Sequence, residues 1–145
     1  PILVQKEKNL SQVIQEFTEL PELCGIVVVD EKKRVIGVIT RRDLLDWARV
    51  QVGTDFRTSG LVLSEDKRLI TIIMASTAGE IIHPGSNRGV VRPQDTLLHA
   101  IQLMIELDLI CLPVVDAAGQ IIGDLKLVEI LSLVAKGVQE MEDSK

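Results

Sequence analysis

The segment from Gly37 to Asp43 carries residue types that could bind a phosphorylated ligand. Thr40 lies where a strand is predicted to give way to a helix. Amides that follow a helix N-cap form a cluster of donors at the positive end of the helix dipole, which suits a phosphate. The Asp43 carboxylate can accept two hydrogen bonds from the vicinal diol of a ribose. Gly37 permits close approach of another backbone or a ligand, and Arg41 and Arg42 could match the charge of a polyphosphate.

The same residues have a purely structural use. Thr-x-x-Asp is close to a capping box, in which the Thr40 hydroxyl accepts from the Asp43 amide and the Asp43 carboxylate accepts from the Thr40 amide. The residues alone leave capping and ligand binding open, and the two uses can coexist.

The elements that must position this motif occur twice, because the chain repeats itself at an offset of 86 residues. Residues 10–49 align with 96–135 without a gap, and seven of the forty positions are identical. The identical positions include Val-Val-Asp at 28–30 and 114–116, Ile36-Gly37 and Ile122-Gly123, and Leu45 and Leu131. A unit of about forty residues buries too little surface alone, so we expect the copies to pack around a pseudo-twofold axis. The crevice between them is then a natural ligand site.

Hydrophobic periodicity predicts helix, strand, turn, strand and helix in each copy. In the first copy these are a helix over 10–20 ended by Pro21, strands over 25–30 and 34–40, and a helix over 41–50. In the second they are a helix over 96–107 with Asp95 as N-cap, strands over 110–116 and 120–125, and a helix over 126–136. Gly137 is expected to end that last helix, and the charged tail to fray.

The segment between the copies is harder to interpret. Residues 51–60 favour a loop, 67–74 a helix or a strand, 78–82 a short helix or strand, and 83–89 an ordered turn. We expect a first repeat over 1–50 with a short leading strand, a linker over 51–76, a second repeat over 77–137 and a tail over 138–145.

Composition disfavours several classes of partner. One Trp, two Phe and no Tyr disfavour single-stranded nucleic-acid binding, and a net charge of −5 disfavours a phosphate backbone. No apolar run approaches the roughly 18 residues of a membrane span. Cys24 and Cys111 are expected to be small core residues in a reducing cytosol. The chain starts at Pro1 without a signal peptide, so we expect a module of a longer protein whose activity lies elsewhere.

Other candidate sites are weak. His83 and His99 have no acidic or Cys companions at metal-ligand spacing, so no metal is expected. The turn at 85–89 lacks the Gly-Lys-Ser/Thr ending of a phosphate-binding P-loop. No nucleophile lies in a recognisable local signature with a base, which disfavours an enzyme. Trp47 is expected to pack a helix or face an interface.

Both copies resemble the cystathionine-β-synthase (CBS) domain, and the whole chain resembles a tandem pair, the Bateman module, over residues 2–50 and 77–136. The resemblance rests on Leu-Pro-Val-Val-Asp at 112–116 and on the Gly-hydrophobic-x-Thr/Ser-x-x-Asp motif, matched by Gly37, Val38, Thr40 and Asp43. It implies an α/β (α+β) fold of two pseudo-twofold-related repeats packed through their small sheets.

The resemblance also implies binding of an adenosine-containing molecule without catalysis. Asp43 would hold the ribose, Thr40 would face the phosphates, and the base would lie against apolar residues. The implied contributors are Val38 and Cys24 from the first copy, and Leu109, Ile110 and the 84–89 approach, including Gly89 and Arg88, from the second.

The second copy departs from the motif. Lys126 replaces the hydroxyl residue, Glu129 replaces the Asp, and Asp124 stands where an apolar residue would face the base. Lys126 could still neutralise a phosphate and Glu129 could still reach a diol, or both are ordinary surface charges. We expect one competent site per chain.

The sequence therefore predicts a non-catalytic regulatory module, cytosolic or the cytosolic part of a membrane protein. It would bind AMP, ADP, ATP or S-adenosylmethionine and transmit occupancy to an effector protein or domain. The alternative is a structural, dimerising module without a ligand. A homodimer suits both, because the second helix of each copy carries more apolar residues than one small core needs. These residues are Leu44, Leu45, Trp47, Ala48, Ile130, Leu131, Leu133 and Val134.

Overall fold

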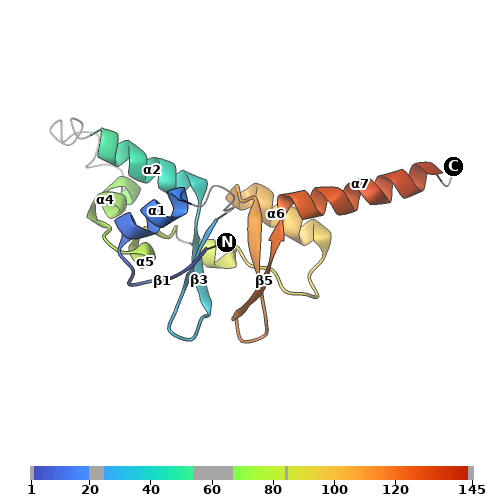
Figure 1. The fold of residues 1–145 in the computed structure, drawn as a ribbon, viewed down its shortest axis with the longest axis horizontal. Helices are drawn as coiled ribbons and strands as arrows, with labels where there is room; N and C mark the ends of the chain where they lie inside the picture. The colour runs from blue at the N-terminus through green and yellow to red at the C-terminus, as the bar shows by residue number, and fades with distance from the viewer. Residues whose placement is uncertain (1, 20–24, 54–66, 84, 144–145) are drawn as a thin grey trace.

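A computed structural model describes residues 2–19, 25–53, 67–83 and 85–143. Two small sheets stand side by side with their hairpin turns at the same end, and helices gather toward the other end (Figure 1). Helix α7 points away from the rest of the molecule. The mixed α/β architecture predicted from the repeat is confirmed.

The first half contains a three-stranded sheet and two helices. Strand β1 (Ile2–Gln5) pairs parallel to β2 (Ile26–Val29), which pairs antiparallel to β3 (Val35–Ile39). Helices α1 (Leu10–Thr18) and α2 (Arg41–Val52) follow β1 and β3. All four residues of β2 are buried, as the uninterrupted Ile-Val-Val-Val run predicts for a central strand.

The second half repeats this order with a two-stranded sheet. Helix α6 (Leu97–Leu107) precedes strands β4 (Cys111–Val115) and β5 (Ile121–Lys126), which pair antiparallel, and α7 (Leu127–Asp143) follows. In place of a leading strand, Val91 makes an isolated parallel bridge to Val114.

Between the halves lie α4 (Lys67–Met74), α5 (Ala78–Ile81) and the 3₁₀ turn η1 (Ser86–Arg88). The ambiguous segment at 67–74 is thus a helix. Two of its β-branched residues, Ile72 and Ile73, pack in the first apolar core, and this packing outweighs the modest helix penalty of such residues. Some predictions fall on residues outside those described by the structure, namely Pro21, Cys24, 54–66 and Pro84.

Two expectations for helix ends are wrong. The N-cap of α6 is Thr96, whose hydroxyl accepts from the His99 amide at 3.1 Å, while Asp95 accepts instead from the Arg92 amide. Gly137 does not end α7, which continues to Asp143 through most of the tail expected to fray. A glycine inside a helix costs only about 1 kcal/mol, which the helix formers around it can offset.

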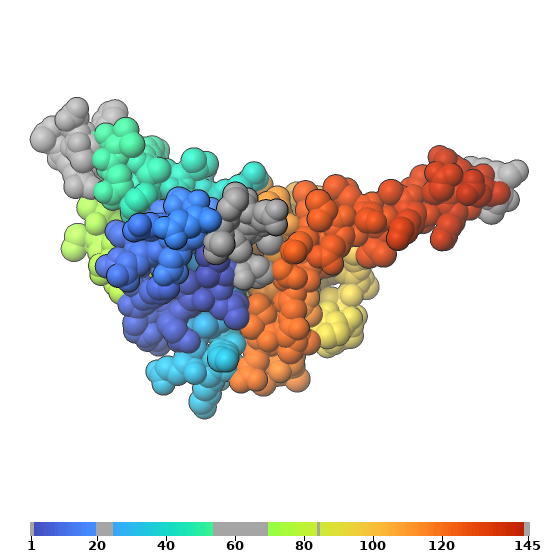
Figure 2. Space-filling model, in the orientation of Figure 1, coloured from blue at the N-terminus to red at the C-terminus, as the bar shows by residue number. Residues whose placement is uncertain are grey.

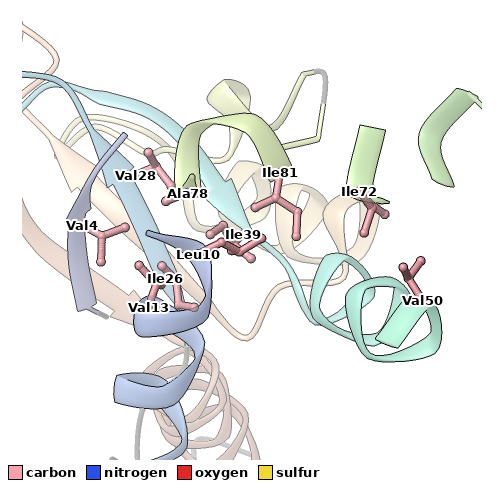
Figure 3. Close-up of a cluster of buried hydrophobic side chains, with 10 residues drawn as sticks. All are labelled: Val4, Leu10, Val13, Ile26, Val28, Ile39, Val50, Ile72, Ala78 and Ile81. Atoms are coloured by element: carbon pink, nitrogen blue, oxygen red, sulfur yellow. The ribbon is translucent and has the colours of Figure 1, made fainter. Parts of the chain in front are cut away.

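Two apolar clusters form the core. The first joins the three-stranded sheet, α1 and α2 to α4 and α5. It consists of Val4, Leu10, Val13, Ile26, Val28, Ile39, Val50, Ile72, Ala78 and Ile81 (Figure 3). The second consists of Val38, Val91, Ala100, Leu103, Met104, Leu109, Leu112 and Ile130. The repeat boundaries at 50 and 77 stay a prediction, but Ile72, Ala78 and Ile81 all belong to the first cluster.

The halves meet through their sheets, as expected. Val38 of β3 is buried in the second cluster. At the hairpin turns, the Val35 amide donates to the Gly119 carbonyl at 3.1 Å, and the Gln120 side chain donates to the Lys32 carbonyl at 2.7 Å. Val38 thus joins the halves near the start of α2, and the turn contacts join them at the opposite end of the sheets (Figure 1).

Candidate functional site: the crevice at the start of α2

Thr40 and Asp43 form a complete capping box at the start of α2. The Asp43 amide donates to Thr40 Oγ1 at 3.1 Å, and the Thr40 amide donates to Asp43 Oδ2 at 2.9 Å. Both residues are buried, Asp43 to 1% exposure. The structural use predicted for Thr-x-x-Asp is therefore confirmed, and it positions the first turn of α2 beside the second half.

A narrow crevice lies there between the two halves, with a cavity volume of about 20 Å³. Its lining comes from both sides and consists of Phe17, Gly25, Ile39, Thr40, Arg41, Leu44, Asp108, Leu109 and Ile110. The structure thus brings Thr40 and Arg41 together with Leu109 and Ile110, which the sequence places almost seventy residues away. The lining is mostly apolar, with Thr40 and Arg41 at the start of α2 and Asp108 at the end of α6 as its polar residues. An apolar wall beside a helix N-terminus suits an apolar group that carries an anion.

A larger hollow of about 340 Å³, open to solvent, adjoins the crevice. It shares Arg41 and the 108–110 segment with it, and adds Ile101, Met104 and Ile105 of α6 and Leu127 and Ile130 of α7. Arg41 and Asp108 lie on the boundary that both hollows share. Arg41 Nη2 and Asp108 Oδ1 are 2.6 Å apart, so an ion pair joins the two halves there.

Asp108 is a site residue that sequence reasoning missed. It ends α6 in the left-handed conformation, with φ of 52°, and its amide caps the carbonyls of Met104 and Ile105. Its position directly before Leu109, with a charge opposite to that of Arg41, was the available signal. Pairing it with Arg41 requires the tertiary arrangement, because 67 residues separate them.

Gly37 and Val38 serve packing behind the crevice. A Cβ on Gly37 would lie 2.8 Å from Ile82 Cδ1 and 2.9 Å from Ser86 Oγ. The absence of a side chain on Gly37 therefore lets Ile82 and Ser86 pack closely against β3. Val38 is 2% exposed, and its amide donates to Ser86 Oγ at 3.2 Å. Ser86 is buried and belongs to the 84–89 approach implied by the resemblance, but its bond to Val38, 48 residues away, was not predicted. Neither Gly37 nor Val38 is among the residues lining the crevice.

The other candidates are placed as follows. Gly89 is buried, and a Cβ there would lie 3.1 Å from the Ser86 carbonyl and 3.2 Å from Leu107 Cδ1. Arg88 Nη2 pairs with Glu106 Oε1 at 3.2 Å on the surface. Cys24 lies outside the described residues. The ligand contacts expected of these residues stay predictions.

The equivalent motif of the second half is weaker. Only the Lys126 amide donates to Glu129 Oε1, at 3.3 Å, and both residues are exposed. Asp124 Oδ2 lies 3.8 Å from Cys111 Sγ. Within the described parts of the chain, no group of three or more His, Cys, Asp or Glu could hold a metal, and no helix is long and apolar enough to cross a membrane.

Residues 1–49 and 79–136 match the sequence model of the CBS domain. The chain belongs to the CBS domain family. It is 28% identical over 150 residues to the chloroplastic CBS domain-containing protein CBSX2 of Arabidopsis thaliana. That alignment covers 98% of this chain and 62% of the relative, so the chain spans less than two thirds of the curated relative's length.

Solved structures of CBS domain pairs share the fold. A CBS domain-containing protein of Thermotoga maritima is 25% identical with a TM-score of 0.71, covering 94% of this chain and 86% of that one. CBSX2 in complex with AMP is 24% identical, TM-score 0.70, covering 94% and 88%. The cytosolic domain of the Mg²⁺ channel MgtE in complex with ATP is 23% identical, TM-score 0.57, covering 91% and 44%.

Proposed function

We propose that this chain is a non-catalytic regulatory module that binds one adenosyl ligand in the crevice at the start of α2. Occupancy of the crevice would be transmitted to an effector protein or domain on the cytosolic side. The observation that carries the proposal is the convergence of Thr40 and Arg41 with Leu109 and Ile110 around one crevice. The complexes of CBSX2 with AMP and of MgtE with ATP support the choice of an adenine nucleotide.

In this proposal each part of the ligand has a partner in the chain. The phosphate lies at the N-terminus of α2, where Thr40 and Arg41 face it. The base packs on Leu109 and Ile110, with Val38 and Cys24 of the first half beside them. Asp43 holds the ribose, and Gly37 and Gly89 leave room for the backbones that shape the pocket.

The burial of Asp43 gives this proposal a mechanical consequence. A carboxylate that is 1% exposed can meet a ribose only if the crevice widens toward it on binding. Because the crevice wall includes the 108–110 segment of the second half, widening moves one half against the other. Such a movement would couple the site to an effector, typically by about 1–3 kcal/mol.

Isothermal titration calorimetry with AMP, ADP, ATP and S-adenosylmethionine tests the proposal, with GMP and GTP as controls. We expect about one site per chain for at least one adenosyl compound. Two equal sites per chain, or binding of guanosine compounds alone, would contradict it.

The second candidate is a dimerising module without a ligand, and it is favoured by the exposed apolar surface of α7. Seven of its apolar residues are exposed: Leu127, Val128, Leu131, Leu133, Val134, Val138 and Met141. We propose a homodimer through the second helices in either case, so sedimentation should give about twice 16.0 kDa. A rise in melting temperature with an adenosyl compound separates the two candidates, because a ligand that binds only the native state stabilises it.

A further inference from the structure

The ion pair between Arg41 and Asp108 occupies the place where a ligand's phosphate is expected. Both residues line the crevice and the larger hollow beside it, and their charged atoms are 2.6 Å apart. Their side chains are 61% and 71% exposed, so the pair is accessible from solvent and can exchange partners.

Arg41 is the basic side chain that lines the crevice at the start of α2 and can meet a phosphate there. Its neighbour Arg42 points its guanidinium to Asp46, with Nε 3.2 Å from Oδ2, and Arg49 shares the same carboxylate at 3.1 Å. A phosphate that approaches the first turn of α2 therefore meets one guanidinium already engaged by a carboxylate. Arginine forms hydrogen-bonded ion pairs with both carboxylate and phosphate oxygens, so the two anions compete for it.

We propose that Asp108 sets the charge selectivity of the site, an inference that rests on the proposed function. Its carboxylate competes with the ligand's phosphate for Arg41 and repels each further phosphate charge. Affinity is consequently held down for ligands with several phosphates, and is left unaffected for a neutral adenosyl compound. Asp108 thereby narrows the ligand class to adenosyl compounds of low negative charge.

The backbone of Asp108 allows a clean test. Its φ of 52° suits asparagine as well as aspartate, and its capping hydrogen bonds come from the main chain. Asp108→Asn therefore removes the charge while keeping the helix end. Glu106→Gln is the matched control, since Glu106 is two residues away, is 55% exposed and pairs with Arg88 instead.

The experiment is calorimetric titration of adenosine, AMP and ATP into the unmodified chain, Asp108→Asn and Glu106→Gln. We expect Asp108→Asn to raise the affinity for AMP about twofold and for ATP about fivefold, the range for an exposed ion pair. The affinity for adenosine should stay unchanged. The gain should shrink in higher salt, because the charges are exposed. Glu106→Gln should change none of the three affinities.

A second pair of variants tests the role of Arg41. In an Arg41→Gln background, adding Asp108→Asn should give less than half of the ATP gain seen with Arg41 present. A full gain there would overturn competition for Arg41. The inference is also overturned if Asp108→Asn weakens AMP, if adenosine tightens equally, or if Glu106→Gln gives the same gain. Failure of every adenosyl compound to bind the unmodified chain would instead refute the proposed function, and the inference with it.

Discussion

Gly37 and Gly123 hold the same position in the two copies, but their surroundings differ. Ile82 and Ser86 press so closely on Gly37 that a Cβ would lie within 3.0 Å of both, whereas a Cβ on Gly123 would meet nothing within 4 Å. The difference arises because α5 and η1 run over β3, while none of the described segments covers Gly123 in the same way. An identical residue in a duplicated sequence thus has a packing role in only one copy.

The second helices show the same contrast. Helix α4 packs on α2, and Val50 of α2 shares the first core cluster with Ile72 of α4. Trp47 packs partly buried against that cluster, whereas its equivalent Leu133 is 56% exposed. Leu45 and Leu131, by contrast, are both exposed. Both helices therefore expose an outer face, and α2 differs by the face that it packs on α4. Helix α7 also extends beyond the body of the molecule (Figure 2).

The site motifs complete the comparison. The first half has both hydrogen bonds of the capping box and a crevice lined by the other half, while the second half keeps a single bond of 3.3 Å between exposed residues. Both copies keep the strand-to-helix turn, but the second, with Lys126 and Glu129, has only one of the two capping-box hydrogen bonds.

The largest expected effect is on stability, from a substitution that breaks the packing between α4 and α2. Ile72→Ala should lower the free energy of unfolding by about 3 kcal/mol, because it removes a fully buried side chain between two helices. In the monomer, Leu133→Ala on α7 should change it by less than about 0.5 kcal/mol, because Leu133 is exposed in the single chain. Urea denaturation of both variants measures this at a protein concentration low enough to keep the chain monomeric. Equal losses there would mean that another part of the same chain covers α7.

A smaller effect is expected on ligand affinity. Asp43→Ala should weaken binding of the adenosyl ligand by about 2 kcal/mol, as for the loss of hydrogen bonds to a charged group, and should lower stability by about 1 kcal/mol as the cap weakens. Thr40→Ser should preserve both properties, and Glu129→Ala should leave affinity nearly unchanged. Calorimetry and denaturation together separate the two roles. If Asp43→Ala unfolds the chain but the folded fraction binds normally, Asp43 is a capping residue alone.

The glycines themselves provide the third test. Gly37→Ala should destabilise the chain by about 1 kcal/mol, the lower end of the range for overpacking, because Ile82 and Ser86 must shift. Gly123→Ala meets open space in a strand and should be neutral or slightly stabilising. Thermal unfolding of the two variants measures the difference, and a reversed order would show that the 82–86 segment does not press on β3.

The smallest effect concerns the first hairpin turn. The Arg34 amide donates to Asp30 Oδ1 at 2.9 Å, and this bond is the main cause that lowers the pKa of Asp30 below its usual 3.8. A lowered pKa stabilises the folded state above pH 3.8, and that contribution is lost as the pH falls through the lowered value. Carboxyl titration by NMR should give a midpoint below 3.8 for Asp30. A midpoint at or above 3.8 would show that the Arg34 bonds are not kept in solution.

Local patterns in the sequence predicted the duplication, the order and type of most elements, and a capping box as one of two possible uses of Thr40 and Asp43. These features depend on local spacing: apolar periodicity, a hydroxyl before a helix, and a carboxylate one turn later. The same local logic explains the misplaced ends of α6 and α7, since Asp95 and Thr96 are both good N-caps and Gly137 is both a stop signal and a tolerable helix residue.

The long-range packing determines which of the two repeats has its glycine and its second helix packed against other segments. The contacts of Gly37 with Ser86 and of Arg41 with Asp108 join residues 49 and 67 positions apart, and no local spacing encodes them. Whether 67–74 forms a helix likewise depended on the apolar groups available to it in the first core. Local preferences there are within about 1 kcal/mol of each other, whereas burial of one aliphatic side chain contributes about 1.5–3 kcal/mol and decides the outcome.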